Sequence, residues 1–450
     1  YVAEAQALAA RQPERAALMW LEAAESGAQA GARAAVVSDL DEALELRGES
    51  LWLLPRARRL LMRLGEYERA IKIGQREVKL GGDTQTRAAV LLESAAVLHH
   101  VLEKGDVALK MLDAALKLQP GNVFALDRAV ELRRVQGLDA ASAAGLEQLS
   151  EHLTDPAQRA LALYGAGTIH ETILHDVEAA KRAYQRAAEA DAQNLPVCVA
   201  LCDVYRQTND TAALARALEH LGELLETAEY RGRLLRLAGM LHLDVCGDLD
   251  AAARALLRAS RATPEDASVW TALSQAQIAR GRPREAVESL RRLLALTQDK
   301  EGRAALLTQI AQLHAQLHEP ERAIAANRDA LEEVESYLPA LQALGTLYRQ
   351  RGDYESLIAI AQPQTEGLLP AEARAVRCLD LAEILAERLE RPEEAVALCR
   401  RAIDLAPELH LAYWALERLL LRLEWHEELA ALYGKHADVC EDPETRAERK

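Results

Sequence analysis

Aromatic residues and long hydrophobic runs are scarce in this chain of 450 residues. Aromatics make up 4% of the sequence, and Phe124 is the only phenylalanine, although 50% of the residues are hydrophobic. A β-sandwich core would need more Val, Ile and aromatic side chains. No apolar run approaches the length of a bilayer-spanning helix, and no signal peptide is visible. The composition therefore predicts an all-α protein, packed through Ala and Leu, with no direct membrane insertion.

Basic residues and cysteines are also few. Lys and Arg total 54 against 70 Asp and Glu, which gives a formal net charge of −16. Nucleic-acid-binding proteins carry a basic surface, so we expect no nucleic-acid partner. The six cysteines show neither a disulfide framework nor a metal-ligand spacing. Together these absences favour a reducing, cytoplasmic location.

What the chain does contain is a repeat of 72 residues. Small residues recur in one column and turn-forming residues in another, with steps of 72, 72, 72, 71 and 72 in both. The first column is Ala43, Ala115, Ala187, Ala259, Ala330 and Ala402. The second column is Gly65, Gly137, Asn209, Gly281, Gly352 and Glu424. Gly and Asn accept the left-handed backbone conformation at helix ends, so the columns predict tandem helical hairpins.

Each period holds two hairpins of different length. Starts near Ala89, Val123 and Leu161 give alternating lengths of 34 and 38 residues. The single step of 71 predicts a one-residue deletion near Gln298–Gly302, in a loop. We expect about twelve hairpins in all. Residues 1–16 form the second half of one, residues 17–440 a continuous superhelix, and residues 441–450 the start of a truncated repeat.

The hairpins resemble tetratricopeptide repeats. Leu341-x2-Leu344-Gly345-x2-Tyr348 is similar to the Trp-x2-Leu-Gly-x2-Tyr start of that family's unit, and Trp270-x2-Leu273 repeats its beginning. Two small residues seven apart, followed by Pro, mark the family's second helix. This pattern is matched by Ala108, Ala115 and Pro120, by Ala252, Ala259 and Pro264, and by Ala395, Ala402 and Pro407. The resemblance covers the whole chain and implies a right-handed α-solenoid. The alternating lengths resemble those of very long bacterial arrays.

Three positions depart from the family pattern. Arg133 and Gln277 replace the Tyr of the first helix, and Gly74 replaces a bulky residue of the second. We expect these departures to loosen the packing locally without changing the fold.

An arginine column marks the start of alternate first helices. Its members are Arg15, Arg87, Arg159, Arg231, Arg303, Arg374 and Arg446. A cation at a helix start opposes the helix dipole, so we expect these arginines to bond carbonyls that end the preceding helix. Arg446 indicates that another repeat begins before the chain stops, which predicts a segment of a longer protein.

Motifs for chemistry are absent or incomplete. His170 and His175 are five residues apart, which breaks the HExxH spacing of zinc proteases, and His314 with His318 lacks a third ligand. Cys198 and Cys202 lie one helical turn apart at core positions, as packed thiols would. No Walker loop or nucleophile elbow is present. The sequence therefore predicts no catalytic residue, metal or cofactor.

The resemblance also implies a concave groove, lined by first-helix positions 2, 5, 9, 12 and 13, where peptides bind. Position 9 of the longer hairpins is Arg59, Glu131, Asp203, Gln275, Thr346 and Arg418. Positions 12 and 13 supply Arg63, Arg134, Arg206, Arg349 and Arg422. Two interpretations of these five arginines stay open. They hold an acidic or phosphorylated segment, or they offset the helix dipole at helix C-termini.

Three functions are compatible with these features. The first is a non-enzymatic scaffold for protein–protein interaction, part of a longer protein that organises a multiprotein assembly. The second is the regulatory or substrate-recruiting arm of an enzyme whose catalytic domain lies outside the segment. The third is a structural element that self-associates.

Overall fold

A computed structural model describes residues 1–363, 367 and 369–439 of the chain. Every regular element in these ranges is helical, and none is a strand, which confirms the all-α prediction. The chain divides into two compact units, residues 1–224 and residues 225–450, each described by itself. Arg446 and the predicted truncated repeat lie outside the described residues.

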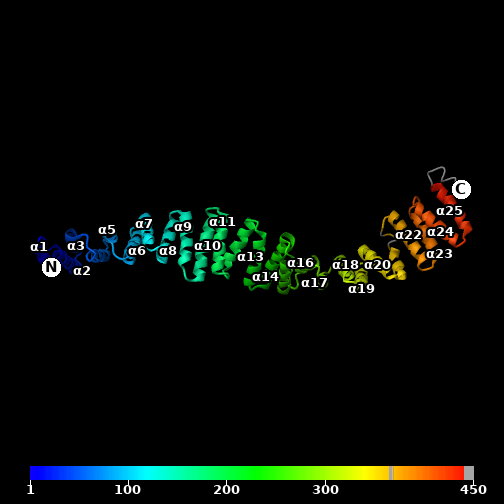
Figure 1. Cartoon of the computed structure of the whole chain (residues 1–450), viewed down its shortest axis with the longest axis horizontal. Helices are drawn as coiled ribbons and strands as arrows, with labels where there is room; N and C mark the ends of the chain where they lie inside the picture. The colour runs from blue at the N-terminus through cyan, green and yellow to red at the C-terminus, as the bar shows by residue number, and fades with distance from the viewer. Residues whose placement is uncertain (364–366, 368, 440–450) are drawn as a thin grey trace. The chain divides into compact units, whose positions relative to one another are not determined.

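The first unit is a series of thirteen described helices (Figure 1). They are α1 (Val2–Leu8), α2 (Pro13–Gln29), α3 (Arg33–Arg47), α4 (Leu54–Leu64), α5 (Tyr67–Leu80), α6 (Thr84–His100), α7 (Gly105–Leu118), α8 (Val123–Val135), α9 (Asp139–His152), α10 (Pro156–Thr172), α11 (Val177–Ala190), α12 (Leu195–Gln207) and α13 (Thr211–Leu224).

The second unit continues the same alternation within its described part. It contains α14 (Ala228–Leu241), the π-helical turn η1 (His242–Cys246), α15 (Leu249–Ala262), α16 (Ala267–Ala279), α17 (Pro283–Leu296), α18 (Lys300–Gln316), α19 (Pro320–Glu333), α20 (Leu338–Arg351), α21 (Tyr354–Pro363), α22 (Ala371–Glu387), α23 (Pro392–Leu405), α24 (His410–Arg422) and α25 (His426–Val439).

Within each unit, consecutive helices pack side by side as hairpins. α1 packs on α2, and α2 begins the first complete hairpin at Pro13, inside the range assigned to the partial one. Short polar side chains cap the N-termini of several helices. Asp83, for example, accepts a hydrogen bond from the Thr86 backbone N–H at 2.6 Å. The array of hairpins is the α-solenoid architecture that the repeat predicts.

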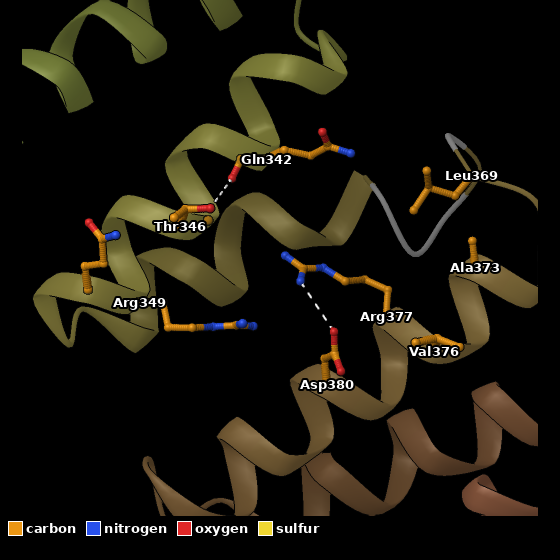
Figure 2. Close-up of a pocket in the computed structure, with 10 residues that line it drawn as sticks. Gln342, Thr346, Arg349, Leu369, Ala373, Val376, Arg377 and Asp380 are labelled. Carbon is orange, nitrogen blue, oxygen red and sulfur yellow. Dashed lines mark hydrogen bonds and ion pairs between the residues drawn. The ribbon is translucent and has the colours of Figure 1, made fainter. Parts of the chain in front are cut away.

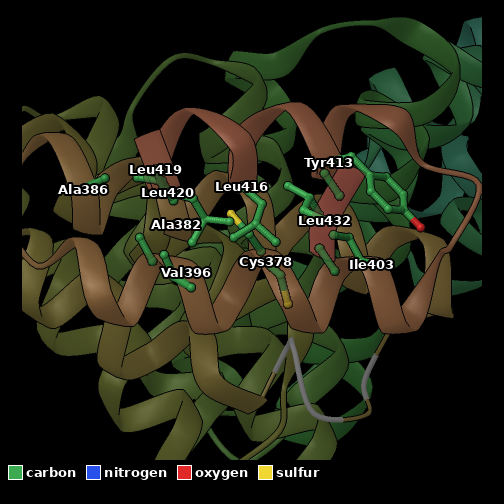
Figure 3. Close-up of a cluster of buried hydrophobic side chains, with 14 of the residues drawn as sticks. Cys378, Ala382, Ala386, Val396, Ile403, Tyr413, Leu416, Leu419, Leu420 and Leu432 are labelled. Atoms are coloured by element: carbon green, nitrogen blue, oxygen red, sulfur yellow. The ribbon is translucent and has the colours of Figure 1, made fainter. Parts of the chain in front are cut away.

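Both predicted columns are confirmed. The six alanines from Ala43 to Ala402 are all buried, at 0 or 1% exposure. The six turn residues from Gly65 to Glu424 all have positive φ, between 53° and 76°. Ala402 belongs to the core cluster of Figure 3, where Ala382 of α22, Val396 of α23, Leu416 of α24 and Leu432 of α25 come together. The close approach of helices here depends on side chains no larger than Ala at the column position.

The boundaries of the alternating hairpins differ from the prediction. From Asp83 to Asn122, the N-caps of α6 and α8, the chain covers 39 residues, and from Asn122 to Asp155 it covers 33. The hairpin predicted to start near Ala89 is therefore the longer one, because α6 begins at Thr84. The first turn of α6 is polar, so the apolar columns do not predict it.

The one-residue deletion also lies elsewhere than predicted. Asp299 follows Thr227 by 72 residues, and both are N-caps, so residues 298–302 keep the register. The short step arises at the C-terminus of α18. There the Glu319 N–H bonds the His314 carbonyl five residues back, whereas the equivalent Asp248 N–H bonds His242 six residues back. α18 thus lacks the wider turn, closed by a backbone hydrogen bond six residues back, that ends α6, α10, α14 and α22.

The expected local looseness at the three departures is wrong. Arg133 donates to Asp113 at 2.7 Å, and the buried Gln277 accepts from Ser289 at 2.6 Å. Gly74 makes room for a buried side chain: a Cβ there would lie 3.2 Å from Cδ of Arg58. Each departure is compensated by a paired polar group, as buried polar atoms require.

Candidate functional site

The five arginines predicted for positions 12 and 13 all lie in the last turn of a first helix. These helices are α4, α8 and α12 in the first unit and α20 and α24 in the second. All five side chains are exposed. Their position is the one that a helix dipole favours for a cation, so the dipole interpretation accounts for their location.

Local partners separate the five arginines into two groups. Arg206 pairs with Asp203 on its own helix at 2.8 Å, and Arg422 donates to the Ala386 carbonyl in the last turn of α22 at 3.1 Å. The side chains of Arg63, Arg134 and Arg349 make no hydrogen bond or ion pair with any residue in the described ranges. The guanidinium N–H groups of these three arginines are available to donate hydrogen bonds to a binding partner.

The position 9 residues lie on the same five helices, except Gln275, which lies on α16. Asp203 is half-buried, and the other five, Arg59, Glu131, Gln275, Thr346 and Arg418, are exposed. Glu131 and Arg418 are engaged by charged neighbours, Arg128 at 2.6 Å and Glu387 at 3.4 Å. Arg59 bonds the Pro55 carbonyl of its own helix at 3.2 Å. Gln275 and Thr346 lack a charged partner among the described residues.

Two of the predicted residues meet in one pocket of the second unit. Thr346 and Arg349 line a cavity of about 560 Å³ between α20 and α22, the first helices of successive hairpins (Figure 2). Gln342 and Gln350 line it too, at positions 5 and 13 of the predicted groove. The four residues come from one face of α20, as the family resemblance implies.

Arg377 is a charged residue of this pocket that the repeat pattern does not predict. It reaches from α22 toward α20, and its Nη2 lies 3.4 Å from where a Cβ of Gly345 would be. Burial lowers the pKa of the Arg377 guanidinium, with a smaller lowering from Arg349, while Asp380 raises it. The sequence does carry a signal for Arg377, because it is a charged residue at a repeat position that is otherwise apolar. The equivalent residues on other first helices are Val90, Ala162, Leu234 and Leu306.

The arginine column at first-helix starts has the structural role predicted for it. Arg159 donates to the Leu153 carbonyl at 2.8 Å, and Arg231 donates to Leu225 at 2.7 Å. Arg303 bonds the Thr297 carbonyl at 3.3 Å. These carbonyls end the preceding helix, so the prediction is confirmed for these three members. Arg15 differs, since it lies 3.7 Å from Glu4.

The histidines and cysteines occupy packing or turn positions. His318 lies past the end of α18 with φ of 58°, so it does not share a helical face with His314. His314 is buried and lies 2.8 Å from the Glu319 carboxylate through its Nδ1. Burial raises the pKa of the Cys202 thiol to about 11, which disfavours the reactive thiolate. No cluster of three or more metal-binding side chains occurs in the part of the chain that the structure describes.

Comparison with known families agrees with this architecture. The model described as tetratricopeptide repeat matches residues 269–304 and 340–362, which span α16 to the start of α18, and α20 with most of α21. The second match includes the face of α20 that lines the pocket. These matches and the hairpin architecture support a tetratricopeptide-repeat protein. Proteins with this repeat generally mediate protein–protein interactions and bind protein partners or peptides, and the fold is typically a non-catalytic scaffold.

Three solved structures are similar to this chain at low sequence identity. YrrB, described as a TPR protein with an unusual peptide-binding site, is 17% identical over 41% of this chain and 91% of its own, with a TM-score of 0.28. A tetratricopeptide repeat protein from Parabacteroides merdae ATCC 43184 is 14% identical over 59% and 99%, with a TM-score of 0.26. The APC/C hetero-tetramer Cut9–Hcn1 gives 12% over 99% and 96%, with a TM-score of 0.25. No curated protein matches the sequence significantly.

None of the helices in the described ranges has the combined length and hydropathy that crossing a bilayer requires.

Proposed function

We propose that the protein is a non-enzymatic scaffold that organises a multiprotein assembly and holds an acidic, extended segment of a partner against its first helices. The observation that carries the proposal is the set of unpaired, exposed arginines Arg63, Arg134 and Arg349. The chain carries 16 more acidic than basic side chains, yet these three cations form no ion pair with an acidic side chain in the described ranges. Guanidinium groups in such positions suit carboxylate or phosphate recognition.

The first step of the test identifies a partner. Full-length protein is purified from its source by affinity capture after cross-linking, and the cross-linked peptides are identified by mass spectrometry. We expect an acidic stretch of the partner to be linked to first-helix residues.

The second step is charge reversal. A triple variant with Arg63→Glu, Arg134→Glu and Arg349→Glu is compared with a control that reverses Arg76, Arg216 and Arg292, exposed residues on the second helices α5, α13 and α17. Both variants change the net charge equally. We expect the first-helix variant to lose at least tenfold in affinity for the partner, and the control to lose less than threefold. Equal losses would mean that net charge, and not the first-helix face, governs binding.

A further inference from the structure

The pocket between α20 and α22 contains two cations and one carboxylate. Arg349 extends from α20 toward α22, Arg377 extends from α22 toward α20, and Asp380 is the one acidic residue among those that line the cavity (Figure 2). Asp380 lies 3.8 Å from Arg377, beyond hydrogen-bonding distance. The positive charge in this pocket is therefore only partly balanced.

The guanidinium of Arg377 lacks the hydrogen bonds that a buried group normally makes. Its side chain is 18% exposed, and its Nε is buried with no partner among the described residues. Buried polar atoms without partners are rare in folded proteins and cost free energy. Arg349 is also without a partner in the described ranges. An oxyanion in the pocket would supply acceptors to both groups.

We propose that this pocket is an oxyanion site, which accepts one carboxylate or phosphate group from a side chain of the partner's extended segment. The inference rests on the proposed scaffold function and assigns one point of contact within it. Arginine forks bind carboxylate and phosphate through paired N–H donors, which sets the chemistry of the ligand. The amides of Gln342 and Gln350 add neutral donors to the lining.

The sequence builds this site at one hairpin among those described. Gly345 leaves the space that the Arg377 guanidinium approaches, and its equivalents are larger, from Arg58 and Val130 to Ser274. The equivalents of Arg377 on α6, α10, α14 and α18 are apolar, as noted above. Ala373 and Val376 provide an apolar wall, and Val376 is 49% exposed. The combination of Gly345, Arg349 and Arg377 does not recur at the equivalent positions.

The experiment measures binding of labelled peptides to the full chain. Three ten-residue fluorescein-labelled peptides of Gly and Ser carry phosphoserine, Glu or Gln at the centre, and fluorescence anisotropy reports their affinity. We expect the phosphoserine and Glu peptides to bind at least tenfold more tightly than the Gln peptide. Their ratio identifies phosphate or carboxylate as the preferred group.

Variants locate the binding to the pocket. Arg377→Met and Arg349→Met should each weaken the anionic peptides at least tenfold, whereas Asp380→Asn should tighten them about threefold. The matched control is Arg351→Met, which removes the same charge from the end of α20 at a residue that does not line the pocket. If Arg377→Met disturbs folding by circular dichroism, exposed Arg349 still provides the test.

Two results would overturn the site. One is equal binding of all three peptides, and the other is an equal loss in Arg351→Met and Arg349→Met. Either result refutes the oxyanion site while partner capture through Arg63 and Arg134 stands. Loss of partner capture altogether would instead refute the scaffold proposal.

Discussion

Single residues show how the repeat tolerates substitutions in its core. Arg58 is 7% exposed and bonds Glu77 at 2.9 Å, with Glu93 as a second partner. A buried arginine at this position is accommodated because Gly74 on α5 has no side chain. Arg58 and Gly74 together explain this departure from the family pattern. From the sequence alone, Gly74 predicts loose packing. A single position of the sequence does not show which neighbour in space compensates for its side chain.

Replacing Gly74 tests this compensation. In Gly74→Leu the new side chain would overlap Arg58 and Val90, whose Cγ1 lies 3.0 Å from the added Cβ. We expect a loss of about 3 kcal/mol or more, because overpacking and a broken buried ion pair act together. The control is Gly434→Leu, at a glycine of α25 with no atom within 4 Å. Urea unfolding followed by circular dichroism measures both, and equal midpoints would contradict the account.

Thiol reactivity tests the burial of the cysteines. Burial raises the pKa of the Cys399 thiol to about 12, so at pH 8 about one thiol in ten thousand is ionised. Cys246 is exposed at the π-helical turn. With iodoacetamide at pH 8, we expect native protein to be alkylated at Cys246 and spared at Cys399, as read from peptide masses. Both should react in urea, and equal reactivity in the native state would be inconsistent with this core.

At the scale of elements, the columns determine how closely helices approach. Ala402 lies on α23 and is fully buried in the core cluster that it forms with residues of the neighbouring helices. Ala402→Phe should cost about 1–3 kcal/mol or more, because the tightly packed helix contact has no space for a ring. Ala397→Phe on the same helix is the matched control, since Ala397 is exposed. If both variants melt at the parent temperature, the register of the repeat is wrong.

Helix ends carry a second column that the sequence does not reveal. Positive φ recurs at Gly31, Glu103, His175, Gly247, His318 and Glu390, in steps of 72, 72, 72, 71 and 72. Four of these six are neither Gly nor Asn, so composition gives no signal. The turn geometry comes from the hairpin, which holds an ordinary residue in the left-handed conformation at a cost of about 1 kcal/mol.

Glycine at these positions should therefore stabilise the protein. We expect Glu103→Gly and Glu390→Gly each to gain about 0.5–1 kcal/mol, after the greater freedom of glycine in the unfolded chain is counted. Glu42→Gly, at an exposed site in the middle of α3, should lose about 1 kcal/mol. Thermal unfolding of the three variants gives the signs, and a destabilised Glu103→Gly would show that the left-handed turn carries no strain.

At the scale of the whole molecule, periodicity predicts the packing better than the binding surface. The alanine and glycine columns are visible because every hairpin meets the same neighbour in the same way. The pocket between α20 and α22 is not periodic: Arg349 belongs to a recurring set, but Arg377 replaces an apolar residue at a single position. A site made by an exception to the repeat cannot be inferred from the repeat. The predicted hairpin starts differ from the observed ones for a related reason, since polar first turns lie outside the apolar columns.

The proposed scaffold holds its partner on the first-helix face, and not on the second-helix face. A photo-crosslinking amino acid at Thr346, which lines the pocket, tests it against the same group at Ala397, exposed on the second helix α23. The yield of cross-linked partner is measured by mass spectrometry in both proteins. We expect an acidic partner peptide attached at position 346 and at least tenfold less at 397. Equal or greater attachment at 397 would contradict it.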